Sequence, residues 1–248
     1  MLEFLYDNEP ARLEWFVQDL VTAAQHTLYG QELLCRATLI DSLAPIDMGQ
    51  LMAYLNLHED LLLEMTNKQL DDLFITGKLA HLIGNSIWIN IAGKLISCPC
   101  LFDCLWQQTL SKLTVEQKQL LVLEICEDTI NSDDSTVARI SFLQNHGFKV
   151  AMDDFGSGNS NLIQLSRSEF DIIKLDLKLI QNIPMDLWAT SLYREVISLC
   201  SSKGSLIVAE GIETQAQSDF VRWAGVDIIQ GFLYSIPRPI TPLIASNA

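Results

Sequence analysis

Residues 135–158 read STVARISFLQNHGFKVAMDDFGSG, and this stretch decides the class of fold. Apolar residues recur every three or four positions over Ser135–His146, which predicts a helix with one buried face. Gly147 follows at the place where a residue that tolerates positive φ commonly ends a helix. The apolar run Lys149–Asp153 then predicts a buried strand that closes on aspartate. The stretch is therefore one helix–strand unit of an α/β protein.

Working outward from this unit, the same alternation of apolar strand and helical stretch recurs along the chain. Eight strands are expected, at Glu14–Leu20, Thr27–Cys35, Ser86–Ile91, Leu120–Ile125, Lys149–Asp153, Asp171–Asp176, Ser205–Glu210 and Val226–Gln230. Too little chain separates the first two for a helix, so we expect an antiparallel hairpin there. The pattern predicts a modified TIM-type (β/α)8 barrel with an antiparallel first strand, in a single domain over residues 1–248.

The composition narrows the classes of function. The net charge of −15 opposes binding to polynucleotides and to anionic membranes. The first ten residues have no basic stretch of the kind that opens a signal peptide. The most apolar segment, residues 79–101, is interrupted by polar residues and is not expected to cross a bilayer. We therefore expect a cytoplasmic protein with no membrane partner.

Six cysteines in a chain without a secretion signal favour reduced thiols. Cys98, Cys100 and Cys104 lie close together in the sequence, as the ligands of a soft metal often do. No second pair and no nearby histidine completes the four-ligand set that zinc requires. Structural thiols are the favoured interpretation.

Polar residues end most of the expected strands, in contrast to their apolar interiors. They are Asn90, Glu124, Asp153 with Asp154, Lys174, Glu210 and Gln230. Burying any of these groups without a partner would cost several kcal/mol. Because the carboxyl ends of parallel barrel strands open on one face, we expect these side chains to converge there.

Carboxylates that converge in this way need compensation, because like charges at short range force protonation or local unfolding. The set comprises Glu32, Glu124, Asp153, Asp154 and Glu210, together with the amide of Asn90. Oxygen ligands of this kind suit two Mg²⁺ or Mn²⁺ ions, and adjacent aspartates suit a bridge between them. Paired cations are a recurring solution for phosphodiester hydrolysis, with Lys174 as a further cation beside the attacking water or a phosphate oxygen.

Seven segments follow one another in an order that resembles a known family. They are GQELLCR at 30–36, INI at 89–91, EICE at 124–127, DDFGSG at 153–158, IKLD at 173–176, AEGIET at 209–214, and QGF at 230–232 followed by Pro237. Together they resemble the EAL-domain family, over nearly the whole chain. The resemblance implies a stand-alone barrel that hydrolyses cyclic di-GMP to linear pGpG in bacterial signalling.

The resemblance also implies roles for individual residues. Glu32, Asn90, Glu124 and Asp153 would hold one metal ion, and Asp153, Asp154 and Glu210 the second. Lys174 would orient or deprotonate the nucleophilic water, with Asp176 supporting it and Gln230 lining the same centre. The expected substrate contacts are Arg36 to a phosphate, Gln18 to a base, and Glu213 and Pro237 along the pocket. Glu127 would anchor the loop from Phe155 to Asn161, near which active members pair as homodimers.

Some positions depart from the family pattern. Asp19 stands where a proline is usual, Leu33 replaces the alanine of the signature, and Asn159 and Asn161 alter the loop. Asp47–Asn56 occupies the place of a family segment that is not recognisable here. The alternative to an active hydrolase is therefore a catalytically silent receptor for cyclic di-GMP, or a protein-binding regulator, on the same fold.

Overall fold

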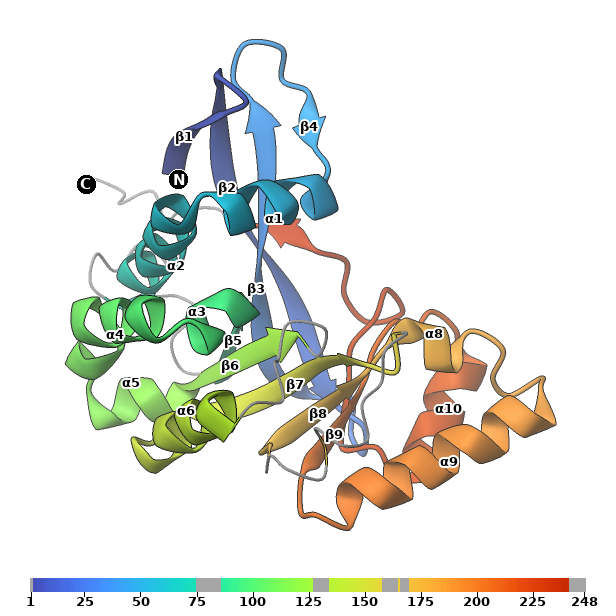
Figure 1. Ribbon diagram of the computed structural model, residues 1–248. Coiled ribbons are helices and arrows are strands. Elements are labelled where there is room, and N and C mark those ends of the chain that lie inside the picture. The colour runs from blue at the N-terminus through green and yellow to red at the C-terminus, as the bar shows by residue number, and fades with distance from the viewer. Residues whose placement is uncertain (1, 75–85, 127–133, 158–164, 166–169, 241–248) are drawn as a thin grey trace, which may run out of the picture.

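A computed structural model of the chain describes residues 2–74, 86–126, 134–157, 165 and 170–240. Its sheet closes on itself in the order β2–β3–β5–β6–β7–β8–β9–β10 and back to β2. Strand β2 is antiparallel to both of its barrel neighbours, and the other barrel pairs are parallel. The protein is therefore a closed eight-stranded α/β barrel of TIM type with an antiparallel first strand, as the sequence predicts (Figure 1).

Each of the eight expected strands overlaps one barrel strand. The strands are β1 Leu2–Tyr6, β2 Glu9–Thr22, β3 Leu28–Leu39, β4 Pro45–Ile46, β5 Ser86–Ile91, β6 Leu121–Cys126, β7 Lys149–Phe155, β8 Ile172–Leu175, β9 Leu206–Ala209, β10 Ile228–Ile229 and β11 Arg238–Pro239. The hairpin of β2 and β3 is much longer than expected, because both strands continue past the barrel. Strands β1, β4 and β11 were not anticipated.

Helices cover the outside of the barrel (Figure 1). They are α1 Met48–Leu57, α2 Glu59–Phe74, α3 Gly93–Ser97, α4 Pro99–Gln108, α5 Val115–Leu120, α6 Asp134–Asn145, α8 Leu177–Ile180, α9 Leu187–Ser201 and α10 Gln215–Ala224, with a 3-10 turn at Leu110–Lys112. Helix α6 matches the helix expected from the opening stretch, and Gly147 after it has φ of +95°. Within the described ranges, no helix combines the length and the apolar character needed to cross a membrane.

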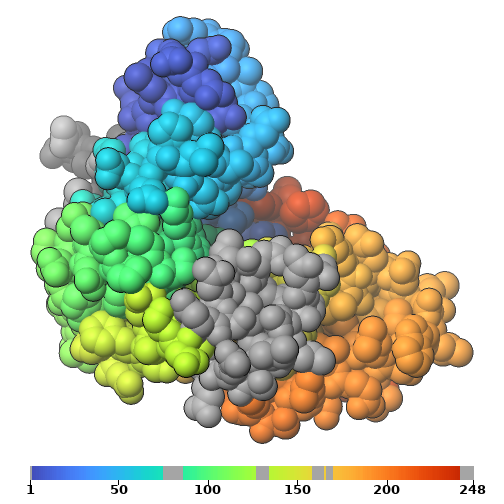
Figure 2. Space-filling view, viewed as in Figure 1, coloured from blue at the N-terminus to red at the C-terminus, as the bar shows by residue number. Residues whose placement is uncertain are grey.

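A lobe of β structure extends beyond the barrel at the ends of β2 and β3. Strand β1 pairs with the start of β2 through a tight turn in which Asp7 and Asn8 both have positive φ. Strand β4 pairs with the end of β3, and Asp47 then caps helix α1. In the space-filling view this lobe stands at the top of the molecule (Figure 2). The segment that departs from the family pattern therefore forms α1.

The barrel interior is layered, because alternate residues of each strand face inward. One layer is a buried apolar cluster of Leu20, Trp88, Val122, Ala151, Ile172, Val208 and Ile228. The next inward-facing position on each of these strands, two residues away, is polar. These residues are Gln18, Asn90, Glu124, Asp153, Lys174, Glu210 and Gln230. Gly30 leaves room for Trp88, since a Cβ there would lie 2.8 Å from the indole nitrogen, and Glu32 follows two residues later. The apolar layer is thus the floor of a polar mouth.

Candidate metal centre

Lys174 of β8 lies in the middle of this polar mouth, with 1% of its side chain exposed. Its Nζ lies 2.7 Å from Glu124 Oε1 and 2.7 Å from Glu210 Oε1. Asp153 Oδ1 lies 3.0 Å from the same atom, and Glu32 Oε2 lies 3.6 Å from it. Barrel closure therefore gathers four carboxylates around one ammonium, at the strand ends where the sequence pattern placed them.

Amide side chains orient the carboxylate of Glu32. Asn90 Nδ2 donates a hydrogen bond to Glu32 Oε1 at 2.8 Å and another to Glu124 Oε2 at 3.3 Å. Gln230 Nε2 donates to Glu32 Oε2 at 2.6 Å and to Gln18 Oε1 at 3.1 Å. Each oxygen of Glu32 thus receives a hydrogen bond, which holds the carboxylate in one orientation. The structure brings all five of these predicted residues together.

Asp154 adds a further carboxylate from an unusual backbone conformation. It has φ of +59° and lies at a register irregularity between β7 and β8. Positive φ is strained for a residue other than glycine and is often retained at functional sites. One carboxylate oxygen each of Asp153, Asp154 and Glu210 lies within 4.8 Å of the others. Burial, followed by the charge of Asp153, raises the pKa of Asp154 to about 6.

The mouth holds more acidic groups than its one lysine can neutralise. Burial and the nearby charge of Glu32 raise the pKa of Glu124 well above its ordinary value. Burial also raises the pKa of Glu210 to about 8, although the charge of Lys174 opposes the shift. Burial lowers the pKa of Lys174, but the surrounding carboxylates outweigh it and raise that pKa overall. Lys174 is therefore protonated, and the carboxylates compete for the remaining protons.

The atoms on offer fit hard divalent cations. The carboxylates of Glu32, Glu124, Asp153, Asp154 and Glu210 present oxygen, the ligand atom that Mg²⁺ and Mn²⁺ prefer. Glu124 Oε1 and Asp153 Oδ1 are buried and accept no hydrogen bond from the described residues, so the Lys174 ammonium is their charged partner. A divalent cation would satisfy such oxygens and relieve the repulsion among the carboxylates.

In the absence of divalent cations, the protein is expected to become less stable as the pH rises from 4.5 towards about 8, the limits set by the ordinary and the folded pKa of Glu210. The raised pKa means that the folded state binds more protons than the unfolded state in this window, so the free energy of unfolding falls with pH. Asp154 contributes in the same direction up to about pH 6. The measurement is the melting temperature in EDTA at successive pH values.

The control for this pH dependence is Glu210→Gln, which removes one titrating group and should flatten the curve. Saturating Mn²⁺ should also restore the stability lost at high pH, because cations and protons compete for the same oxygens. Asp72 has a lowered pKa of about 2, so its stabilising effect changes only below this window. A wild-type melting temperature that stays level or rises with pH in EDTA would contradict the account.

Two predicted substrate residues lie at the rim of the mouth. Arg36 is four residues after Glu32 on β3 and so lies on the same face of the strand. The central carbon of its guanidinium lies 5.7 Å from the centre of the Phe16 ring, and this cation–π contact helps to fix the position of the charge. Asp176 caps helix α8, because its Oδ1 accepts a hydrogen bond from the Lys178 amide at 2.7 Å.

The other predicted residues are less closely tied to the centre. Glu213 is exposed just before α10, and Pro237 is half-buried just before β11. The backbone next to Glu213 packs closely against the loop at Gly231, since a Cβ on Gly231 would lie 2.1 Å from the carbonyl oxygen of Ile212. Glu127 and the loop positions Asn159 and Asn161 lie outside the described residues.

An anchor between β2 and the C-terminal segment was missed at the sequence level. Asp19 accepts hydrogen bonds from Arg238 Nη2 at 2.8 Å and from Gln31 Nε2 at 2.7 Å. Gln18 Nε2 donates to the Ser235 carbonyl at 2.8 Å, which ties the same segment down. The aspartate that replaces a proline thus holds the C-terminal segment against β2. No local pattern could reveal the contacts of Asp19 with Arg238 and of Gln18 with Ser235, because each pair lies more than 200 positions apart.

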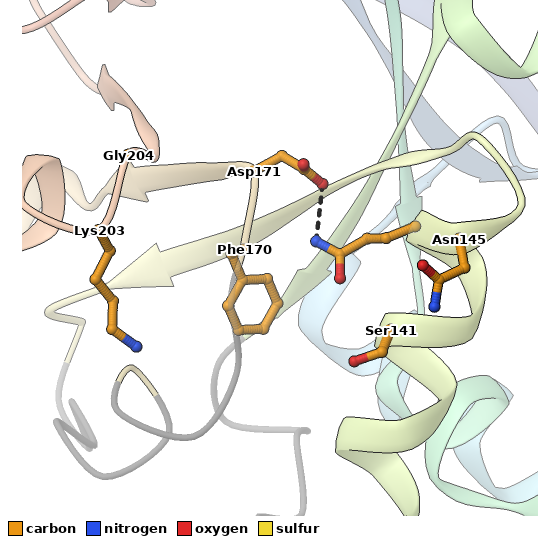
Figure 3. Close-up of a pocket in the computed structure, with 7 residues that line it drawn as sticks. Ser141, Asn145, Phe170, Asp171, Lys203 and Gly204 are labelled. Atoms are coloured by element: carbon orange, nitrogen blue, oxygen red, sulfur yellow. Dashed lines mark hydrogen bonds between the residues drawn. The ribbon is translucent and has the colours of Figure 1, made fainter.

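A separate hollow of about 570 Å³ lies at the other end of the barrel strands (Figure 3). Gln144 of α6 and Asp171, just before β8, line it and are joined by a hydrogen bond of 3.0 Å. Lys203 and Gly204, just before β9, lie opposite. These residues precede their strands, whereas active sites of such barrels lie at the carboxyl ends. The hollow is therefore not part of the acidic mouth.

Known proteins resemble the chain over most of its length. The model of the EAL domain matches residues 11–237. The chain is 30% identical over 234 residues to the probable cyclic di-GMP phosphodiesterase PdeG of Escherichia coli K12. The matched region covers 91% of this chain and 44% of the relative. The chain spans less than half the length of the curated relatives that it matches.

Solved structures show the same architecture. The PaMucR phosphodiesterase in complex with c-di-GMP superposes with a TM-score of 0.78 at 26% identity, over 92% of both chains. A manganese and cyclic di-GMP complex of BlrP1 from Klebsiella pneumoniae has a TM-score of 0.73 at 25% identity, over 91% of this chain and 56% of that one. Both are similar to this chain over the whole barrel.

Proposed function

The chain belongs to the EAL domain family, and from this premise we propose that it is a cyclic di-GMP phosphodiesterase that opens one phosphodiester bond to give linear pGpG. One observation carries the proposal. Four buried or part-buried carboxylates and the Lys174 ammonium converge at the carboxyl ends of the barrel strands: Glu32, Glu124, Asp153 and Glu210. One positive charge among four acidic groups leaves room for divalent cations, and Glu124 Oε1 and Asp153 Oδ1 accept no hydrogen bond from the described residues. Relatives and structural neighbours that carry cyclic di-GMP in their names support the choice of substrate.

Two Mg²⁺ or Mn²⁺ ions would complete the mouth. Glu32, Asn90, Glu124 and Asp153 would hold one. The amide of Asn90 now turns its nitrogen to Glu32 and Glu124, and it would have to rotate to offer its oxygen to the ion. The compact group of Asp153, Asp154 and Glu210 would hold the other. Such cations lower the pKa of bound water and stabilise the negative charge that develops on the phosphate.

The protein's own side chains would orient the reacting groups. Lys174 carries a proton in this arrangement, which favours a role in positioning water and a phosphate oxygen by charge and hydrogen bonding. Asp176 would support it from the start of α8. Arg36 would bind a phosphate at the rim, and Gln18 would bind a guanine base. Gln230 would keep the carboxylate of Glu32 in its orientation.

Product analysis tests the proposal. Purified protein incubated with cyclic di-GMP and Mn²⁺ is expected to form pGpG, and EDTA is expected to stop the reaction until Mn²⁺ is added back in excess. Chromatography of the nucleotides against authentic pGpG provides the readout. Binding of cyclic di-GMP under saturating Mn²⁺ with no pGpG would show that the chain is a receptor and that the hydrolase proposal is wrong.

We also propose a homodimer in the cytoplasm, and the surface of α9 supports the dimer. Leu187 is 83% exposed, Trp188 77%, Leu192 45% and Leu199 47%, and Met185 before the helix is 90% exposed. Helix α9 lies along the outer edge of the molecule in the space-filling view (Figure 2). Exposed large apolar side chains gathered on one helix commonly mark a protein interface. All six cysteines carry free thiols, which is consistent with a reducing compartment.

The double variant Trp188→Glu with Leu192→Glu is expected to convert the dimer to monomer, because two charges cannot be buried across the interface without partners. Light scattering coupled to size exclusion measures the mass. Leu57→Glu on α1, where the leucine is 81% exposed, is the matched control and should leave the mass unchanged. A dimer that survives the double variant would place the interface elsewhere.

A further inference from the structure

Two cysteine thiols touch at the junction of α3 and α4. Cys98 ends α3 and is the residue before helix α4, which begins at Pro99. Its Sγ lies 3.1 Å from the Sγ of Cys100. Cys98 is half-buried and Cys100 is exposed, so both can be reached from solvent. The pair lies outside the acidic mouth, on the helical layer that follows β5.

The backbone at this junction already has the separation that a disulfide needs. Pro99 is the first residue of α4, so the distance between the flanking Cα atoms is that of two residues in a helix. Helix geometry makes this distance about 5.4 Å. The Cα atoms of a disulfide usually lie within about 4.4–6.8 Å of each other. The Cα separation and the contact of the two sulfurs at 3.1 Å therefore both favour closure of a disulfide here.

The two thiols have different chemical roles. The backbone amide of Leu101 in the first turn of α4, and then the contact with the Cys100 thiol, lower the pKa of Cys98. The same contact raises the pKa of Cys100. By comparison, burial raises the pKa of the Cys200 thiol to about 11, which makes that cysteine a poor nucleophile. Because the thiolate is the nucleophile in exchange, Cys98 is the attacking thiol and Cys100 is placed to resolve the product.

We propose that Cys98 and Cys100 form a reversible thiol–disulfide site that exchanges with low-molecular-weight disulfides such as oxidised glutathione. The Cys98 thiolate attacks one sulfur of the small disulfide, which releases one small thiol and leaves a mixed disulfide. The Cys100 thiolate then attacks the Cys98 sulfur and releases the second small thiol. Two protons pass from the protein thiols to the released thiols, the protein pair is oxidised by two electrons, and the small disulfide is reduced by two.

Oxidation by glutathione disulfide tests the site on the full chain. The reduced protein is expected to lose about 2 Da in intact mass, and peptide mapping should find Cys98 joined to Cys100. Cys100→Ser should instead accumulate glutathione on Cys98, because the resolving thiol is absent. Cys98→Ser should react at least about tenfold more slowly than the wild type, since the favoured nucleophile is lost. Dithiothreitol should reverse each product.

Two features keep the result interpretable. Serine is itself a good residue to begin a helix, so Cys98→Ser should fold normally, as circular dichroism would show. Cys104→Ser, four residues further along α4, is the matched control and should oxidise as the wild type does. A wild type that keeps both thiols, that joins either of them to Cys104, or that stops at the glutathione adduct would overturn the proposal.

Discussion

Lys174→Met is expected to lower the rate of cyclic di-GMP hydrolysis by at least about a thousandfold, within the range that a positioned charged or proton-carrying group contributes. Methionine keeps the volume of the lysine stem, so the barrel floor of apolar side chains stays packed. The charge that four carboxylates share is lost, and removing one partner of a buried ion pair costs about 3–5 kcal/mol. The metal-free variant should therefore also melt at a lower temperature.

Mn²⁺ separates the two effects of this substitution. Cations bind only the folded state, so they should raise the melting temperature of the variant substantially while activity stays lost. Lys149→Ala is the matched control, because that lysine is exposed on a neighbouring barrel strand. Activity within tenfold of the wild type in Lys174→Met would show that the central ammonium takes no part in turnover.

Glu32→Gln should produce the second large effect, a fall of about a hundred- to a thousandfold in kcat/KM, which corresponds to roughly 3–4 kcal/mol of lost stabilisation. The amide keeps the shape of the side chain but removes a charge that two amides and Lys174 hold in place. Those groups lower the pKa of Glu32 even though burial opposes them, so the wild-type side chain is charged. The substitution also replaces one acceptor oxygen with an NH₂ group. That donor would face the donating amide nitrogen of either Asn90 or Gln230.

Metal affinity provides an independent readout for Glu32. Calorimetric titration with Mn²⁺ in the absence of nucleotide is expected to show affinity weakened by at least about tenfold, because a charged oxygen ligand is lost. Glu64→Gln, an exposed glutamate on α2, is the control and should bind Mn²⁺ as the wild type does. Unchanged Mn²⁺ affinity in Glu32→Gln would remove this residue from the ligand set.

Much of the architecture was open to prediction because strand and helix periodicities are local. The run Ser86–Ile91 was delimited correctly, since it is apolar, partly β-branched and closed by a change of composition. The strand expected at Val226–Gln230 is only Ile228–Ile229 in the structure, because the chain leaves the sheet as it enters the loop of Gly231. Strand β11 escaped notice since it is two residues long and pairs with a strand more than 200 positions earlier.

The sequence by itself determined which side chains could line the mouth. On each strand a polar residue lies two positions from an apolar one, so both face the same side. Only the tertiary structure decided that Lys174 stands among four carboxylates, that Asp19 holds Arg238, and that the pKa of Glu210 rises to about 8. Periodicity needs only neighbours along the chain, whereas burial and charge–charge distances depend on closure of the barrel. That closure brings together residues that no local pattern connects.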